Sequence, residues 1–197
     1  MLELRRHQVS SKLLTHTHVY YHFSAELLAV GSFSPEHKHT EMYQPTSGNW
    51  STVQDYPFLP NVGKYVAKYA VLYYDDAFYL FGGHTAYFTP YSIHSYSNLF
   101  TQTIAQLDTK TKIWSKIGIL RQGRQGHGAI YYDGKFFVFG GRKNPKSKND
   151  AQVKNEVCTL KGSKMTCIEQ STGLDKYRYY PELFLVAENF VKDNNDC

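Results

Sequence analysis

Two histidines and two tyrosines lie close together in one segment of the chain, residues 84–96. They are His84, Tyr87, Tyr91 and His94. Imidazole nitrogens and phenolate oxygens bind copper or iron, so a metal site is one interpretation. However, the spacing matches no compact metal-binding motif, and the segment contains no Asp, Glu or Cys. We therefore expect no metal and no cofactor here. Tyrosine offers a large contact area at low entropic cost, so these side chains are candidate binding residues.

A second segment, residues 142–150, is basic. It begins with Arg142 and Lys143 and holds two further lysines. Such a loop attracts an acidic partner, although lysine-rich loops are also common as solvated surface. The sequence contains no nucleophile–base set, phosphate-binding loop or dinucleotide fingerprint. These residues favour binding over catalysis, and we expect the chain not to be an enzyme.

Two of the three cysteines are placed symmetrically about a turn. Cys158 and Cys167 flank Gly162-Ser163, so in a two-residue hairpin they face each other directly. Opposed Cβ atoms lie about 4.5–5.5 Å apart and a disulfide needs about 3.8 Å, so a bridge requires only a slight adjustment. A disulfide favours an oxidising compartment, and thus a secreted protein or an ectodomain. The alternative is two reduced cysteines in a cytosolic adaptor.

The composition favours strands and argues against two kinds of partner. Aromatic residues make up 16% of the 197 residues, with 17 Tyr and 12 Phe, and aromatic residues favour β-strands. The formal charge of +5 is too small and too dispersed to indicate a nucleic-acid partner. No run of about 18 apolar residues is present, so we expect no membrane span. The charged N-terminus does not resemble a secretory signal peptide.

Three segments that align without gaps organise the chain, namely residues 22–31, 73–82 and 131–140. Each has the pattern of a strand, a two-residue turn and a second strand. The Asp133-Gly134 turn is the clearest, because both central positions of a type I′ turn need positive φ. A glycine ends each copy, and in the last two copies it belongs to a pair. The glycines are Gly31, Gly82, Gly83, Gly140 and Gly141.

A second hairpin follows each copy and is marked by two residues seven positions apart. In the third copy the second of these residues is a cysteine where the others have tryptophan. Four strands per copy, with the closing glycines 51 and 58 residues apart, match the size of a propeller blade. The pairs are Tyr43 and Trp50, Leu107 and Trp114, and Leu160 and Cys167.

This combination of a Gly-Gly pair after an apolar strand and a distal hairpin with Trp resembles the Kelch-repeat β-propeller family. The resemblance covers residues 17–191 and is divergent, because Ser32, Leu107, Leu160 and Cys167 depart from the family's pattern. It implies an all-β fold of blades with four antiparallel strands, about three blades plus a partial fourth. It also implies that the Trp of each fourth strand packs between blades.

The resemblance sets the expected boundaries. Residues 1–16 fit no blade, and the blades are expected at about 17–60, 61–120 and 121–175, with a partial fourth at 176–197. Closed propellers have about 4–8 blades, so we interpret the chain as part of a larger propeller. The alternative is an open sector that closes by oligomerising. The expected strands are 19–23, 26–31, 40–44 and 49–53, then 67–74, 77–81, 103–107 and 113–117, then 127–132, 135–139, 156–160 and 165–169.

The Kelch resemblance implies a protein-binding scaffold with a protein as partner. Loops 84–100 and 142–152 join second to third strands and share a face with the connections between blades, where binding sites usually lie. Residues 121–127 are similar to the segment that opens a Kelch blade, which implies that Arg124 and His127 point to this face. The alternative is a fragment of a propeller enzyme, either a galactose-oxidase-like copper oxidase or a glycosidase.

Overall fold

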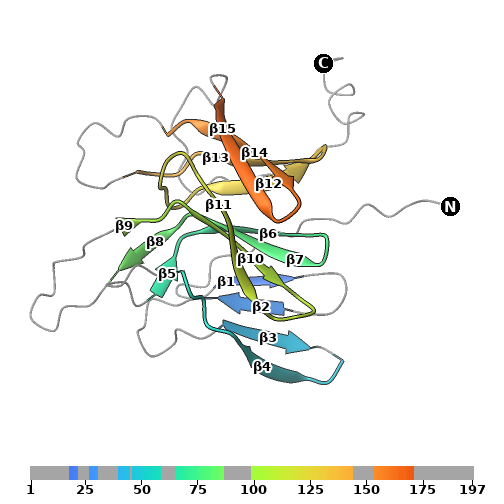
Figure 1. Cartoon of the computed structure of the whole chain (residues 1–197). Coiled ribbons are helices and arrows are strands. Elements are labelled where there is room, and N and C mark those ends of the chain that lie inside the picture. The colour runs from blue at the N-terminus through green and yellow to red at the C-terminus, as the bar shows by residue number, and fades with distance from the viewer. Residues whose placement is uncertain are drawn as a thin grey trace, which may run out of the picture.

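Antiparallel hairpins make up nearly all the regular structure of the described residues (Figure 1). The computed structural model describes residues 18–21, 27–30, 40–44, 46–58, 65–86, 99–143 and 153–170. The unassigned segment 1–16 and the partial fourth blade at 176–197 lie outside this set. The all-β prediction is confirmed. None of the described residues forms a helix long and apolar enough to cross a membrane.

The first blade is a four-stranded sheet, drawn in blue to teal in Figure 1. Its strands are hydrogen-bonded in chain order and lie within two residues of the predicted bounds. The predicted two-residue turn between the first two strands is wrong, because Leu28 lies opposite Tyr20 and not Tyr21. The connection between the strands is therefore longer than the aligned copies suggested. The strands are β1 (His18–Tyr21), β2 (Leu27–Val30), β3 (Thr40–Gln44) and β4 (Asn49–Val53).

The second and third blades repeat this order of four strands. Type I′ turns close their first hairpins, as predicted, because both central residues have positive φ. The values are 47° and 55° at Asp75 and Asp76, and 47° and 77° at Asp133 and Gly134. Blade two consists of β6 (Ala70–Tyr74), β7 (Ala77–Phe81), β10 (Thr103–Asp108) and β11 (Trp114–Ile119). Blade three consists of β12 (Gly128–Tyr132), β13 (Lys135–Phe139), β14 (Asn155–Lys161) and β15 (Lys164–Gln170).

Three short strands that the sequence did not predict form a separate sheet. They are β5 (Tyr65–Ala67), β8 (His84–Ala86) and β9 (Leu99–Phe100), paired in the order β5-β8-β9. The segment 84–100 is therefore a strand at each end and not a loop throughout. The predicted strand 67–74 is likewise divided between β5 and β6, and Lys68 between them has a φ of 54°.

Blades two and three are joined into one eight-stranded sheet through their outer strands. β11 and β15 run parallel and meet at Gly118 and Met165. A Cβ atom at Gly118 would lie 2.5 Å from the Met165 carbonyl oxygen, so only glycine allows this approach. The inner strands β6 and β12 also lie side by side, so the two blades face each other.

The same three positions are paired across the second, third and fourth strands of every blade. In each blade one residue of the third strand lies opposite a residue of the second strand and a residue of the fourth. Cys158 takes the position of Tyr43 and Leu107, so the predicted alignment of Leu160 there is wrong. The paired residues of the third and fourth strands are nine positions apart in blade three, but the alignment assumed the spacing of blades one and two. The three sets are Leu27, Tyr43 and Trp50; Phe78, Leu107 and Trp114; and Phe136, Cys158 and Cys167.

Two apolar cores lie between the blades. Between blades one and two, the Trp114 indole packs edge-on against Tyr56, with ring centroids 5.2 Å apart, and donates from Nε1 to the Gln54 carbonyl at 3.0 Å. Between blades two and three, the buried Cys158–Cys167 disulfide occupies the equivalent position. The predicted packing of the fourth-strand Trp between blades is confirmed for Trp114, and the predicted disulfide is present.

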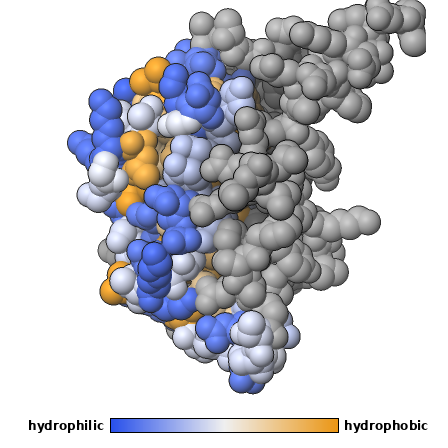
Figure 2. All heavy atoms as spheres, turned by 90° about the vertical axis from the view of Figure 1, so that its right-hand side faces the viewer, coloured by the Kyte–Doolittle hydropathy of each residue, from blue (hydrophilic) through white to orange (hydrophobic). Residues whose placement is uncertain are grey.

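Trp50 differs from its two counterparts. Its ring is tilted by 41° against that of Tyr43, with centroids 5.2 Å apart, but 49% of its surface is exposed, against 4% for Trp114 and 3% for Cys167. The expected burial of Trp50 between blades is therefore wrong for this structure. On the side where the β6–β7 and β10–β11 hairpins end, the described residues are largely hydrophilic, with small separate apolar patches (Figure 2).

Candidate functional site

The connector between β11 and β12, residues 121–127, runs between the ends of two hairpins. At one hairpin, the Gly83 amide donates to the Arg124 carbonyl at 2.8 Å. At the other, Gln125 and Arg142 exchange two backbone hydrogen bonds of 3.0 and 2.9 Å. These bonds tie the connector to the residues that follow β7 in blade two and β13 in blade three.

The paired glycines are needed for this close approach. Gly82 has a φ of 57° and Gly141 a φ of 87°, a conformation that side chains disfavour. A Cβ atom at Gly82 would lie 2.9 Å from the Arg124 carbonyl oxygen. A Cβ atom at Gly141 would lie 2.7 Å from the Cβ of His127. The repeat glycines therefore leave room for the connector as well as ending the strands.

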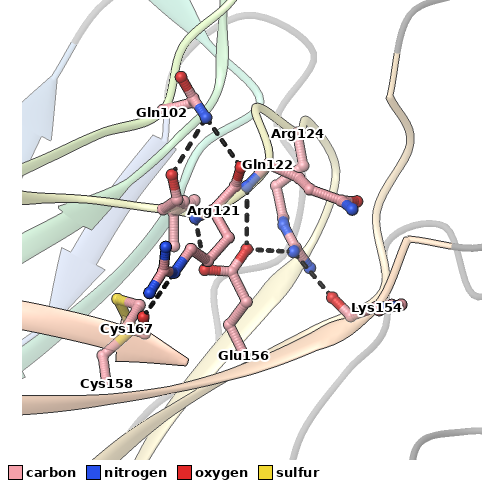
Figure 3. Close-up of a disulfide and its surroundings, with 9 residues drawn as sticks. Gln102, Arg121, Gln122, Arg124, Lys154, Glu156, Cys158 and Cys167 are labelled. Carbon is pink, nitrogen blue, oxygen red and sulfur yellow. Dashed lines mark hydrogen bonds and ion pairs between the residues drawn. A yellow bond between two sulfur atoms is a disulfide. The ribbon is translucent and has the colours of Figure 1, made fainter. Parts of the chain in front are cut away.

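A buried ion pair fixes the connector to blade three (Figure 3). Arg124 and Glu156 are both fully buried, and Arg124 Nη2 lies 2.5 Å from Glu156 Oε1. The guanidinium also donates to the carbonyls of Gly140 at 3.2 Å and Lys154 at 2.8 Å. Burial lowers the pKa of Arg124, and the nearby Glu156 carboxylate opposes that shift.

The Glu156 carboxylate is bonded from several sides. Besides Arg124, the backbone amide of Arg121 donates to Oε2 at 2.7 Å and that of Gln122 to Oε1 at 3.3 Å. The Arg121 side chain continues to the carbonyl of Cys167 at 3.0 Å, next to the disulfide (Figure 3). Charge-assisted bonds of this kind are strong, so the connector is held rigidly.

Two buried histidines belong to this site: His127 is the last residue of the connector, and His84 follows Gly83. The pKa of His127 is lowered to about 3 by burial and by the Arg124 charge, which the Phe81 backbone opposes. The pKa of His84 is lowered to about 4 by burial and by the Lys68 charge, which the Ala67 backbone opposes. Both imidazoles are therefore neutral at neutral pH.

Both predicted binding loops begin at this connector. The segment 84–100 starts directly after Gly83, and the segment 142–152 starts at Arg142, each bonded to the connector backbone. The Gly126 amide donates to the Lys68 carbonyl at 2.8 Å, which adds the turn between β5 and β6 to the same face. One face of the molecule thus gathers the starts of both segments, one turn and one blade connector.

The predicted contact residues are placed unevenly on this face. Arg142 and Lys143 are partly exposed, as a binding role requires. Arg124 and His84 are buried, so the expectation that Arg124 points out to the face is wrong: its guanidinium is taken up by Glu156 and two carbonyls. The remaining three, Tyr87, Tyr91 and His94, lie outside the described residues.

One group of potential metal ligands occurs among the described residues. Ligand atoms of Glu156, Cys158 and Cys167 lie within 4.8 Å of one another. The two sulfurs are bonded to each other, and Glu156 already binds Arg124 and two backbone amides, so this group offers no open coordination site.

Glu156 is the residue of this site that sequence reasoning missed. It was placed on a strand, and its carboxylate was not assigned a role. Glu41 of blade one occupies the equivalent position, opposite Ala29 as Glu156 lies opposite Val138. This repeat is seen only in the pairing of the strands, because the sequence alignment set Leu160, and not Cys158, at the position of Tyr43.

The comparisons with known proteins agree with this architecture. No protein-family model matches the chain. Kelch domain-containing protein 3 of Bos taurus and that of Homo sapiens are each 35% identical to it over 66 residues, which are 32% of this chain and 17% of each relative. The chain therefore spans less than a fifth of the length of these curated relatives.

A solved structure matches a much larger part of the chain. The structure of YjhT superposes on 81% of this chain and 48% of its own, with a TM-score of 0.60 and 15% sequence identity. Because the sequence identity is low, this structural similarity supports the fold alone. Together with the three registered copies and their paired glycines, these matches support the fold of a divergent Kelch-type β-propeller.

Proposed function

We propose that the chain is a protein-binding scaffold whose contact face is formed by the segments 84–100 and 142–152 around the blade connector. One observation carries the proposal: the connector is bonded to the start of both segments, at Gly83 and at Arg142. Loops held at fixed points on a rigid framework are where protein-binding sites commonly lie. The matched relatives are named for a Kelch domain, which is consistent with a scaffold role.

The charge of this face indicates the chemistry of the partner. Arg142 and Lys143 are partly exposed, and Lys68 lies in the adjoining turn. The whole chain has a formal charge of +5. A basic face raises the association rate of acidic partners and disfavours basic ones. We therefore expect an acidic protein surface or peptide as the partner.

Charge reversal tests this proposal. The variant R142E/K143E reverses the charge of the proposed face. K135E/K164E is a matched control, because Lys135 and Lys164 are exposed at the starts of β13 and β15, at the strand ends away from the proposed face. Proteins that co-purify with each variant from source cells are quantified. We expect a protein that is recovered with the unmodified chain and the control, and reduced about tenfold or more with R142E/K143E. Equal recovery with all three would contradict the proposed face.

We also propose that the chain is not an enzyme. The side chains that could have held copper include His84, which is buried beside the connector. Metal analysis of the purified chain, with H84A/H94A as the comparison, tests this point. Stoichiometric copper that is lost in the variant would contradict the scaffold proposal and favour an oxidase.

The disulfide supports the further proposal that the chain works in an oxidising compartment, either secreted or as an ectodomain. The chain isolated from its own cells is alkylated without reductant and analysed by mass spectrometry. We expect the 158–167 peptides to be linked. Free thiols at both positions would place the chain in a reducing compartment.

A further inference from the structure

The outer face of blade one resembles an interface without its partner. Tyr43 and Trp50 occupy the positions that, in blades two and three, face the preceding blade. Those counterparts are 0–4% exposed, whereas Trp50 is 49% exposed and Tyr43 is partly exposed. An exposed indole at a position that is otherwise buried between blades indicates a surface made for a further blade.

The outer face of blade three has the same character on the opposite side of the molecule. Strand alternation directs Phe137 and Phe139 away from blade two, and their rings stack with an interplanar angle of 5°. Both are partly exposed, whereas the equivalent Tyr79 and Phe81 of blade two are 2% and 0% exposed.

Two more exposed side chains with apolar surface continue this face of blade three. Ile168 follows the inward-facing Cys167 on β15 and is 58% exposed, and Tyr132 follows the inward-facing Tyr131 on β12 and is 53% exposed. In blades one and two the position of Ile168 is held by an exposed serine, Ser51 or Ser115. At this position, the outer face of blade three is therefore more apolar than the equivalent faces of blades one and two, which the next blade of the same chain covers.

We propose that a second copy of this chain covers both faces, with blade three of each copy packed on blade one of the other. Such a head-to-tail contact closes when its rotation is a half-turn, and then forms a two-fold ring. The chain aligns with 48% of the YjhT chain, so two copies would together match nearly the whole of a solved propeller. The ring buries both apolar faces in each copy and leaves neither exposed. This inference does not depend on the proposed binding function.

The blade-one face adds one chemical requirement. It carries Glu41, which is exposed and equivalent to Glu156, whose carboxylate is neutralised by Arg124 from the connector before its blade. A covering copy that buries Glu41 is stabilising only where a basic group lies beside the carboxylate, so we expect one at this interface. The formal charge of +5 on each copy makes basic groups available for this role.

The mass of the purified chain in solution tests the proposal. A chain of 22.7 kDa is expected to give twice that mass by light scattering, with dissociation on dilution. Trp50→Asp and Ile168→Asp each alter both interfaces of the ring, so each is expected to weaken self-association by about tenfold or more. Ile113→Asp is the matched control, because Ile113 is 55% exposed in the β10–β11 turn and lies on neither face.

Mixing the two variants separates ring closure from other forms of association. A ring of one Trp50→Asp copy and one Ile168→Asp copy keeps one unaltered interface, so the mixture should dimerise more strongly than either variant alone. All variants should retain a cooperative unfolding transition. A monomer at all concentrations, open-ended polymers, or a dimer unaffected by both substitutions would each overturn the proposal.

Discussion

Arg124 and Glu156 carry opposite charges in the interior, and their placement fixes the connector on which both proposed binding segments rest. Removing one partner of a buried pair leaves an uncompensated charge, which costs more than the pair itself contributes. Arg124 was predicted to point to the binding face because residues 121–127 are similar to the segment that opens a Kelch blade. Its burial depends on Glu156, which is 32 residues away, and no local pattern reveals that contact.

Replacing Glu156 tests the pair. We expect Glu156→Gln to lower the free energy of unfolding by about 3–5 kcal/mol, measured by urea denaturation, because Arg124 stays buried without a counter-charge. The double variant R124Q/E156Q should cost less than the sum of the two single variants. The exposed pair of Lys154 and Glu169 is the control, and Lys154→Gln should have little effect. Equal effects at both sites would contradict a special role for the buried pair.

The two buried histidines predict the response of the fold to pH. Their folded-state pKa values of about 4 for His84 and about 3 for His127 lie below the unfolded value of 6.5. The unfolded state therefore binds more protons in acid, so the stability is complete above pH 6.5 and falls as the pH decreases below it. The loss approaches about 1.4 kcal/mol per pH unit for each histidine.

Unfolding measured between pH 7 and pH 5 checks this dependence. Carboxylates with lowered pKa, such as Asp108 and Glu169, lose their contribution only at lower pH. The variant His127→Gln should reduce the slope of the unfolding free energy against pH by up to roughly 1.4 kcal/mol per pH unit, the contribution of one proton. A slope that is unchanged in the variant would mean that His127 is not buried in its neutral form.

At the scale of the elements, the tight turns of blades two and three were predictable, whereas the predicted turn of blade one was wrong. The Asp133-Gly134 turn and the four strands of blade three follow from alternation and turn residues alone. The pairing of Cys158 with Cys167 was also predictable, because symmetry about Gly162-Ser163 sets it locally. The alignment of Leu160 failed, because hairpin length varies between the blades. The short strand β8 was missed, since its partner β5 is distant in sequence.

A comparison of two glycines tests the role of the repeat glycine pair. Gly82 and Gly134 both have positive φ, but only Gly82 lies against the connector, and a Cβ atom at Gly134 would meet nothing within 4 Å. Both Gly→Ala variants should lose roughly 1–2 kcal/mol from backbone strain. Gly82→Ala should lose about 1–3 kcal/mol more, because the Arg124 carbonyl must move. Thermal or urea unfolding measures both, and equal losses would contradict the packing role of Gly82.

At the scale of the whole molecule, the sequence predicted three blades of four strands, and their stacking is visible in Figure 1. The sequence did not predict which Trp is buried, because that depends on the neighbouring blade and not on the residue's own hairpin. Trp114 is covered by Tyr56 and Gln54 of the segment after blade one, whereas Trp50 faces away from blade two. The exposure of Trp50 and the burial of Trp114 therefore show that blade two packs against blade one, and that no described residues cover the other face of blade one.

The two tryptophans are the only ones in the chain, so their fluorescence tests this order directly. Trp50→Phe leaves Trp114 as the single emitter, and Trp114→Phe leaves Trp50. Both are made with Ile168→Asp, so that self-association does not cover Trp50. We expect blue-shifted emission that acrylamide barely quenches for Trp114, and red-shifted, readily quenched emission for Trp50. Equal quenching of the two, or a Trp114 more accessible than Trp50, would contradict the packing of blade two against blade one.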